Sequence, residues 1–135
     1  MKAGTALFNA VIRHLIAIFT AKPFSFAREQ IGGLKDDGVS KPQIYIEESE
    51  SRFWQSATFD GETHRFIICV EGGARQDQMA VRVMADEVIK AFEGVDLSMG
   101  GHVLIDLVFT KVFYEKADEG RSRARLFFTA VTVVD

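Results

Sequence analysis

Two long apolar stretches near the C-terminus decide the fold. They read His102-Val-Leu-Ile-Asp-Leu-Val-Phe-Thr-Lys-Val-Phe-Tyr114 and Arg121-Ser-Arg-Ala-Arg-Leu-Phe-Phe-Thr-Ala-Val-Thr-Val-Val134. Most of their residues are β-branched, aromatic or leucine, which favour strands. The polar segment between them ends in Gly120, which suits a tight reversal. The sequence therefore predicts one long antiparallel hairpin, whose strands should extend past the body of a small domain.

The second of these strands carries three arginines on one of its two sides. Arg121, Arg123 and Arg125 alternate along the end next to the loop. In one interpretation they form a solvated arm and pair with the acidic residues of segment 115–119. In the other they contact a second subunit, together with Phe113, because the rigid fork of donors on arginine suits desolvated contacts with carboxylates.

Length and composition indicate one folded domain. The chain has 135 residues, of which 47% are hydrophobic and 26% are charged, as is usual for a soluble globular domain. We therefore treat residues 1–135 as a single domain. The net charge of −3 provides no overall basic field, which disfavours a role in binding nucleic acid.

The only cysteine and the N-terminal segment bear on the cellular compartment. Cys69 has no partner for an internal disulfide and lies in the apolar run Phe66–Val70, where we expect it to be buried in a protein of a reducing compartment. Residues 3–21 are apolar, but Arg13 and His14 interrupt them. We therefore expect a helix and neither a signal peptide nor a membrane anchor.

The first predicted helix spans Thr5 to about Thr20 and ends before Pro23. Its polar residues fall along one narrow strip, so its apolar face is unusually wide. One sheet face cannot bury so wide a surface, and we expect a second surface, for instance a neighbouring copy of the protein. Leu7 and Val11 are the residues of this helix that we assign to such a subunit interface.

The segment from Lys22 to Pro42 contains both prolines of the chain and three of its glycines. It is longer than most loops in compact domains, and such loops are often functional. Two interpretations stay open: a binding loop, or a connector that only spans the distance between two elements.

Two strands are predicted in the middle of the chain. Gln43–Glu48 is a short strand, and the segment Ser49–Trp54 after it ends in a tryptophan that we expect to cover the core. Asp60 and Gly61 form a turn signal, and Thr63–Glu71 is the next strand. The two strands are expected to pair as neighbours.

Helical periodicity returns between about Arg75 and Glu93, with Gly94 as a C-terminal stop. The apolar residues share one face, as in a helix that covers a sheet. A turn at Val95–Gly101 then leads into the long hairpin. The predicted order is α-β-β-α-β-β, which is an α+β domain with a four-stranded, mainly antiparallel sheet and a long C-terminal β-hairpin, packed by two helices.

The sequence offers little for catalysis. Its three histidines, His14, His64 and His102, lack the spacing of metal ligands and have no cysteine partner. Neither a glycine-rich phosphate loop nor a nucleophile in a known catalytic motif occurs. We therefore predict no cofactor, no metal and no catalytic residue, and we do not expect an enzyme.

Several features in series resemble the tail terminator, or tail completion, family of long-tailed phages and gene transfer agents. They are an N-terminal helix, a tryptophan followed by Asp60-Gly61-Glu62 and a strand, the helix Ala80-Val-Arg-Val-Met-Ala-Asp-Glu-Val-Ile89, the strand start Gly100-Gly101-His102-Val103, and the final motif Arg121-x-Arg123-x-Arg125-x-Phe127. The resemblance spans about residues 5–134. The connection Lys22–Pro42 is longer than is usual in the family, so no contact of this segment carries over.

The resemblance implies a structural protein of the virion that is assembled in the host cytoplasm and placed at the head-tail junction. It implies a hexameric ring that caps the tail tube protein, stops its polymerisation and docks the head-completion or stopper protein. DNA would pass through this ring without specific binding. Six copies would carry a charge of about −18, and Glu47, Glu48 and Glu50 are our candidates for an acidic lining of the lumen.

Three alternatives stay open. The first is a different oligomeric adaptor, for instance a protein of the neck or of head completion, or the related tube-capping subunit of a contractile apparatus. The second is a small α+β enzyme or ligand-binding domain, in which Glu48, Arg52 and His64 would converge near Trp54. The third is a nucleic-acid binder that uses the three arginines at 121–125, for which retention on heparin is expected, whereas a capping ring should not be retained.

Overall fold

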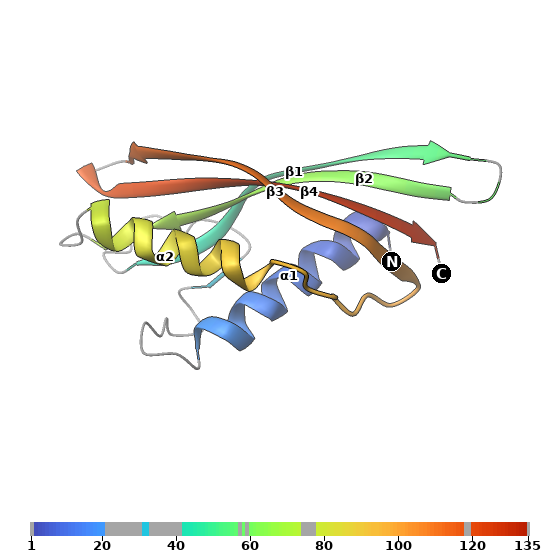
Figure 1. The fold of residues 1–135 in the computed structure, drawn as a ribbon, viewed down its shortest axis with the longest axis horizontal. Coiled ribbons are helices and arrows are strands. Elements are labelled where there is room, and N and C mark those ends of the chain that lie inside the picture. The colour runs from blue at the N-terminus through green and yellow to red at the C-terminus, as the bar shows by residue number, and fades with distance from the viewer. Residues whose placement is uncertain are drawn as a thin grey trace.

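The structure, a computed structural model, describes residues 2–20, 31–32, 42–56, 58, 60–73, 78–117 and 120–134. Its helices and strands follow the predicted order α-β-β-α-β-β (Figure 1). They are α1 (Ala3–Phe19), β1 (Gln43–Gln55), β2 (Asp60–Glu71), α2 (Gln78–Ala91), β3 (His102–Lys116) and β4 (Ser122–Val134). The predicted α+β fold is confirmed.

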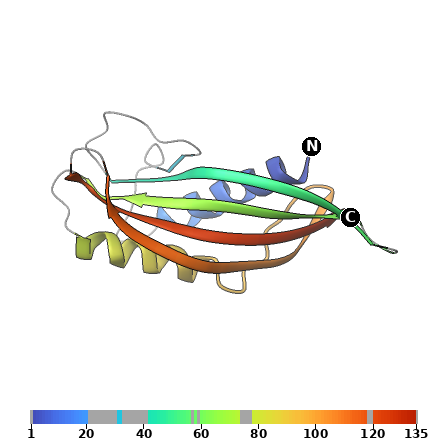
Figure 2. The ribbon, with the colours of Figure 1, turned by 90° about the horizontal axis from the view of Figure 1, so that it is seen from above.

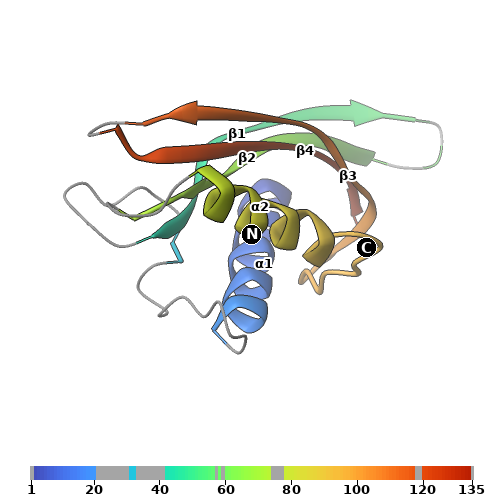
Figure 3. The same cartoon turned by 60° about the vertical axis from the view of Figure 1, so that its left-hand side comes forward.

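The four strands form one antiparallel sheet in the order β1-β2-β4-β3, so β1 and β3 are its edges (Figure 2). The predicted pairing of β1 with β2 and the long hairpin of β3 with β4 are both present, and Gly120 in the reversal has a φ of +71°. Both helices lie on the same side of the sheet (Figures 1 and 3). Of the elements that the structure describes, none covers the other side.

The core lies between the sheet and the two helices. Along β4, buried and half-buried side chains alternate, as they do in a strand with one face against a core. Phe128 and Phe66, on the neighbouring strand β2, stack with 5.4 Å between their ring centroids. Val81 and Val88 of α2 are fully buried in the same cluster. The arginines of β4 at 123 and 125 therefore point away from the helices.

The apolar surface of α1 is largely covered within the chain. Leu7 and Val11 are 3% and 1% exposed and belong to the core. On another side of α1, the His14 Nε2 lies 2.7 Å from the carbonyl oxygen of Ala91, at the end of α2. Phe8, Ile12 and Ile16 are only partly buried, so contact of α1 with a second copy along this strip stays a prediction.

Strands β1 and β2 are longer than predicted. The expected strand 43–48 and the segment 49–54 form one strand with a bulge between Ile46 and Ser49. β2 begins at Asp60, so the predicted turn residues already belong to a strand. Trp54 pairs with Gly61, and its ring lies so close that a Cβ on Gly61 would be 2.2 Å from it. Trp54 therefore packs on the neighbouring strand, on the side away from the helices, and does not cover the core.

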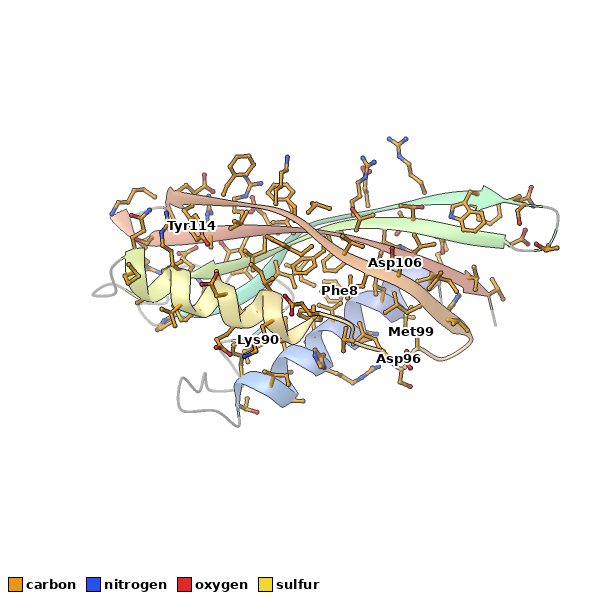
Figure 4. The ribbon with its side chains drawn as sticks, in the orientation of Figure 1. Phe8, Lys90, Asp96, Met99, Asp106 and Tyr114 are labelled. Carbon is orange, nitrogen blue, oxygen red and sulfur yellow. The ribbon has the colours of Figure 1, made fainter. Side chains whose placement is uncertain are left out.

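The loop end of the β3–β4 hairpin does not project from the body, contrary to the prediction. The N-terminal half of α2 lies beneath it, and the Arg82 guanidinium is 3.9 Å from the centroid of the Tyr114 ring (Figure 4). The β1–β2 hairpin extends beyond the helices instead (Figures 1 and 3). Near its tip, Phe53 is 63% exposed.

The predicted loop Lys22–Pro42 lies mostly outside the described residues. Ile31 forms a parallel bridge with Ile44, and the Gly32 amide donates to the Ile44 carbonyl at 2.9 Å. The outer edge of β1 is therefore covered at Ile44.

Candidate functional site

The side of the sheet that faces away from both helices is the candidate functional site, and we call it the open face. Its side chains stand on the far side of the sheet from the helices (Figure 4). Paired residues share a face, so Ile67, Phe127 and Lys111 form one row across three strands. Tyr45, Ile67 and Cys69 are buried and form a small apolar cluster with Phe127. The open face is thus partly apolar and not simply a solvated surface.

Two bulges lie at the same level of the sheet, one in each edge strand. They fall between Ile46 and Ser49 in β1 and between Phe109 and Lys111 in β3. Bulges bend a strand and increase its twist. A groove of about 1020 Å³ crosses the open face at this level. It is lined by Glu47, Ser49, Glu50, Arg65, Phe66, Ile67, Thr110, Lys111, Phe127, Phe128 and Thr129.

Two of the three predicted arginines pair with carboxylates on the open face. Arg123 donates to Glu115 Oε1 from Nε at 3.1 Å and from Nη2 at 2.8 Å, so the predicted pairing with the loop region is confirmed for this residue. Arg125 Nε instead donates across the sheet to Glu47 Oε2 at 2.9 Å. Burial by itself raises the pKa of Glu47, but hydrogen bonds from Cys69 and Arg125 outweigh it and lower this pKa. The carboxylate of Glu47 is therefore held ionised.

The third arginine, Arg121, is enclosed at one end of the sheet. It is 8% exposed, and its Nη1 lies 3.5 Å from Oε1 of Glu71, which is 1% exposed. The hydroxyl of Tyr45 donates to the same carboxylate at 2.9 Å. The sequence does not predict the contact between Tyr45 and Glu71. Glu71 is a charged residue at a strand end before two glycines, and such a position gives no signal of burial. The predicted role of Arg121 at a subunit interface is corrected, since it is enclosed by its own chain.

Of the other residues predicted for a subunit interface, two are buried in the core and one is exposed. Leu7 and Val11 lie in the core, so we also correct their assignment to an interface. Phe113 is 51% exposed and lies edge-on to Phe127, with 5.6 Å between the ring centroids. The Lys111 ammonium is 4.7 Å from the centre of the Phe127 ring. Contact of Phe113 with a second copy stays a prediction.

The predicted acidic lining is not an isolated acidic patch. Glu50 lies 3.7 Å from Arg52 Nε and 3.9 Å from Arg65 Nη1, and Glu47 pairs with an arginine of β4. The side chain of Glu48 lies outside the described part of the structure. Charges of both signs therefore lie side by side on the open face. Arg52 belongs to the same strand as Glu50, whereas Arg65 and the arginine that pairs with Glu47 come from other strands.

The ligand site suggested by Arg52 and His64 does not form. Arg52 is on the open face, whereas His64 points to the helix side and is 1% exposed. The His64 Nδ1 lies 2.7 Å from Ser51 Oγ, and its Nε2 lies 2.8 Å from Thr132 Oγ1. Burial lowers the pKa of His64, and the smaller opposing effect of Glu62 does not reverse this. His64 is a neutral structural residue that links three strands.

The remaining sequence predictions concern metals, membranes and the cysteine. Among the residues that the structure describes, no three His, Cys, Asp or Glu side chains are grouped closely enough to hold a metal ion. No helix in this part of the chain has the length and apolar character needed to span a membrane. Cys69 is buried, as predicted, and donates to Glu47 at 2.9 Å. Burial raises the pKa of its thiol, which therefore stays protonated.

No model of a protein family and no curated protein matches this sequence. The structure, however, is similar to a chain in the solved structure of the virion of a native gene transfer agent particle, with a TM-score of 0.79. The two chains are 21% identical, and the match covers 98% of this chain and 99% of that chain. The similarity extends over both helices and the whole sheet, and it shows a shared fold.

Proposed function

We propose that this chain is a structural protein of a virion or virion-like particle, and specifically a tail terminator. In this role it forms a ring, with six copies as the expected number, on the end of the tail tube. The observation that carries the proposal is the match of the entire fold to a chain of a gene transfer agent virion. The series of motifs from the first helix to the final arginine-rich strand supports the same family.

The open face and the sheet edges support a role in assembly. Val103, Val108 and Phe113 are apolar residues of β3 that are 41%, 45% and 51% exposed. Exposed apolar side chains along an uncovered edge strand are a liability in a monomer and mark a surface that another protein covers. A ring would pair this edge strand with a different patch of the next copy, through a heterologous interface.

In the proposed ring the open face borders the channel and the helices lie outside. Arg123 and Arg125 are already paired with carboxylates, so they offer few free cations to DNA phosphates. Arg52 and Arg65 are 78% and 67% exposed and lie near a single carboxylate, that of Glu50. We therefore base the passage of DNA without specific binding on the net charge of −3 per chain. The partners of the ring are the tail tube protein on one side and the head-completion or stopper protein on the other. The proposal assigns the chain no enzymatic activity.

The same observation also fits a second candidate function, another adaptor at the head-tail junction. The matched structure is described as a particle, and its description names no position within it. An adaptor of this kind would bind to a tail that is already capped and would leave tube polymerisation unaffected.

Polymerisation of the tail tube protein in the presence of this chain tests the proposal. A terminator is expected to stop elongation and to appear as a ring at one end of each tube in negative-stain images. Tubes of unchanged length with no added density at their ends would contradict it. Density at the end of capped tubes alone would favour the adaptor.

A further inference from the structure

The two edge strands of the sheet run in opposite directions. Each strand is antiparallel to its neighbour in the order β1-β2-β4-β3, so β1 and β3 are antiparallel to each other. When two copies stand side by side in the same orientation, β3 of one meets β1 of the next with antiparallel polarity. The sheet can therefore continue from copy to copy without any change in its pattern.

Among the described residues, none pairs with the outer side of either edge strand along most of its length. On the outer side of β1, the described residues form one bridge, at Ile44, and from Ile46 to Gln55 none of them pairs with it. β3 pairs with β4 on its inner side, and Ile105, in a bulge, is 59% exposed. The unpaired amides and carbonyls of such edges are a template for another strand.

We propose that β3 of one copy pairs with β1 of the next in an in-line register. Within one sheet, each β3 residue lies in a row with one residue of β1. In the in-line register, the β3 residue of one copy faces that same β1 residue in the next copy. Rows are traced through the paired residues, and Asp106 shares its row with Arg52. By the same tracing, Val103 shares a row with Trp54, and Lys111 is level with the bulge at Glu47. The proposal rests on the ring of the proposed function and names the strands and the residues that close it.

Charge complementarity selects this register. Opposite charges that face each other on adjacent strands stabilise the pairing, and like charges weaken it. In line, Asp106 of one copy faces Arg52 of the next, whose side chain is 78% exposed. A shift by two residues in one direction places Asp106 opposite Glu50, which is repulsive. The opposite shift places it beside Trp54, which leaves the charge without a partner.

A pair of cysteines tests the register directly. In one variant Arg52→Cys and Asp106→Cys are combined, and in the matched control Glu50→Cys and Asp106→Cys are combined. Within one chain β1 and β3 are separated by two strands, roughly 14 Å in total, so a disulfide can only join two copies. Cys69 is buried and does not compete. Oxidation of the assembled protein is expected to give a ladder of crosslinked species from the first variant and none from the control.

The results of this crosslinking experiment distinguish a failure of the strand pairing from a failure of the proposed ring. Crosslinking of the control, alone or to the same extent, would overturn the in-line register. A multimer of the 15.1 kDa chain that crosslinks in neither variant would overturn the in-line pairing of β3 with β1 and leave the ring in place. A protein that stays monomeric in solution and on tail tubes would overturn both.

A charge exchange provides a second test that needs no oxidation. The single substitutions Arg52→Asp and Asp106→Arg are each expected to reduce the oligomeric fraction in light scattering, because each creates a repulsive pair. The double variant should restore it. A double variant that is no more oligomeric than the single ones would overturn the pairing of these two residues.

Discussion

At the scale of single residues, His64 makes stability depend on pH. Its pKa is lowered from the ordinary value of 6.5, chiefly by burial. Below about pH 6.5, His64 therefore binds a proton in the unfolded chain but stays neutral in the folded chain. The free energy of unfolding consequently falls as the pH falls. Urea denaturation between pH 7 and pH 5 should show this decrease. In the His64→Gln variant we expect lower stability overall and a smaller dependence on pH, and an unchanged slope would contradict the account.

Glu71 tests the buried ion pair with Arg121. Removal of one partner of a buried pair leaves a charge without compensation, and the Glu71→Gln variant is expected to lose about 3 kcal/mol in the free energy of unfolding. Glu50→Gln is the matched control, because Glu50 is on the same face but exposed, and we expect a change within about 0.5 kcal/mol. If both variants lose the same free energy of unfolding in urea denaturation, the burial of Glu71 does not contribute to stability.

At the scale of elements, the β1–β2 hairpin depends on the contact between Trp54 and Gly61. A methyl group on Gly61 would lie 2.2 Å from the Trp54 ring, so Gly61→Ala should displace the ring and destabilise the protein by about 1–3 kcal/mol. The chain has one tryptophan, so its fluorescence reports on this site alone and should shift to longer wavelength. Gly100→Ala is the control, because a Cβ there meets no atom within 4 Å. Identical emission spectra of the two variants would contradict this role for Gly61.

The sequence predicts the order of the elements because the periodicity changes clearly between helix and strand. It misses the full length of β1, since the bulge between Ile46 and Ser49 interrupts the alternation of side chains. It also shows that α1 has a wide apolar face, but not that α2 lies against it. Partners such as Arg125 and Glu47 are 78 residues apart, and only the folded sheet brings them together.

At the scale of the whole molecule, the paired arginines determine the response to polyanions. With a net charge of −3 and arginines bound to carboxylates, the protein should pass through a heparin column at about 0.15 M salt. The variant that combines Glu47→Gln with Glu115→Gln releases Arg123 and Arg125 and is expected to be retained more strongly. Firm retention of the unaltered protein would instead favour the nucleic-acid binder.

The proposed function requires that this chain form a closed ring. Light scattering over a series of concentrations, combined with negative-stain images, measures this directly, both for the protein alone and after the addition of tail tubes. We expect a species of about six times the 15.1 kDa chain mass with a central hole, in solution or at the tube tips. A mass of 15.1 kDa at every concentration, with no ring on the tubes, would contradict the proposed function.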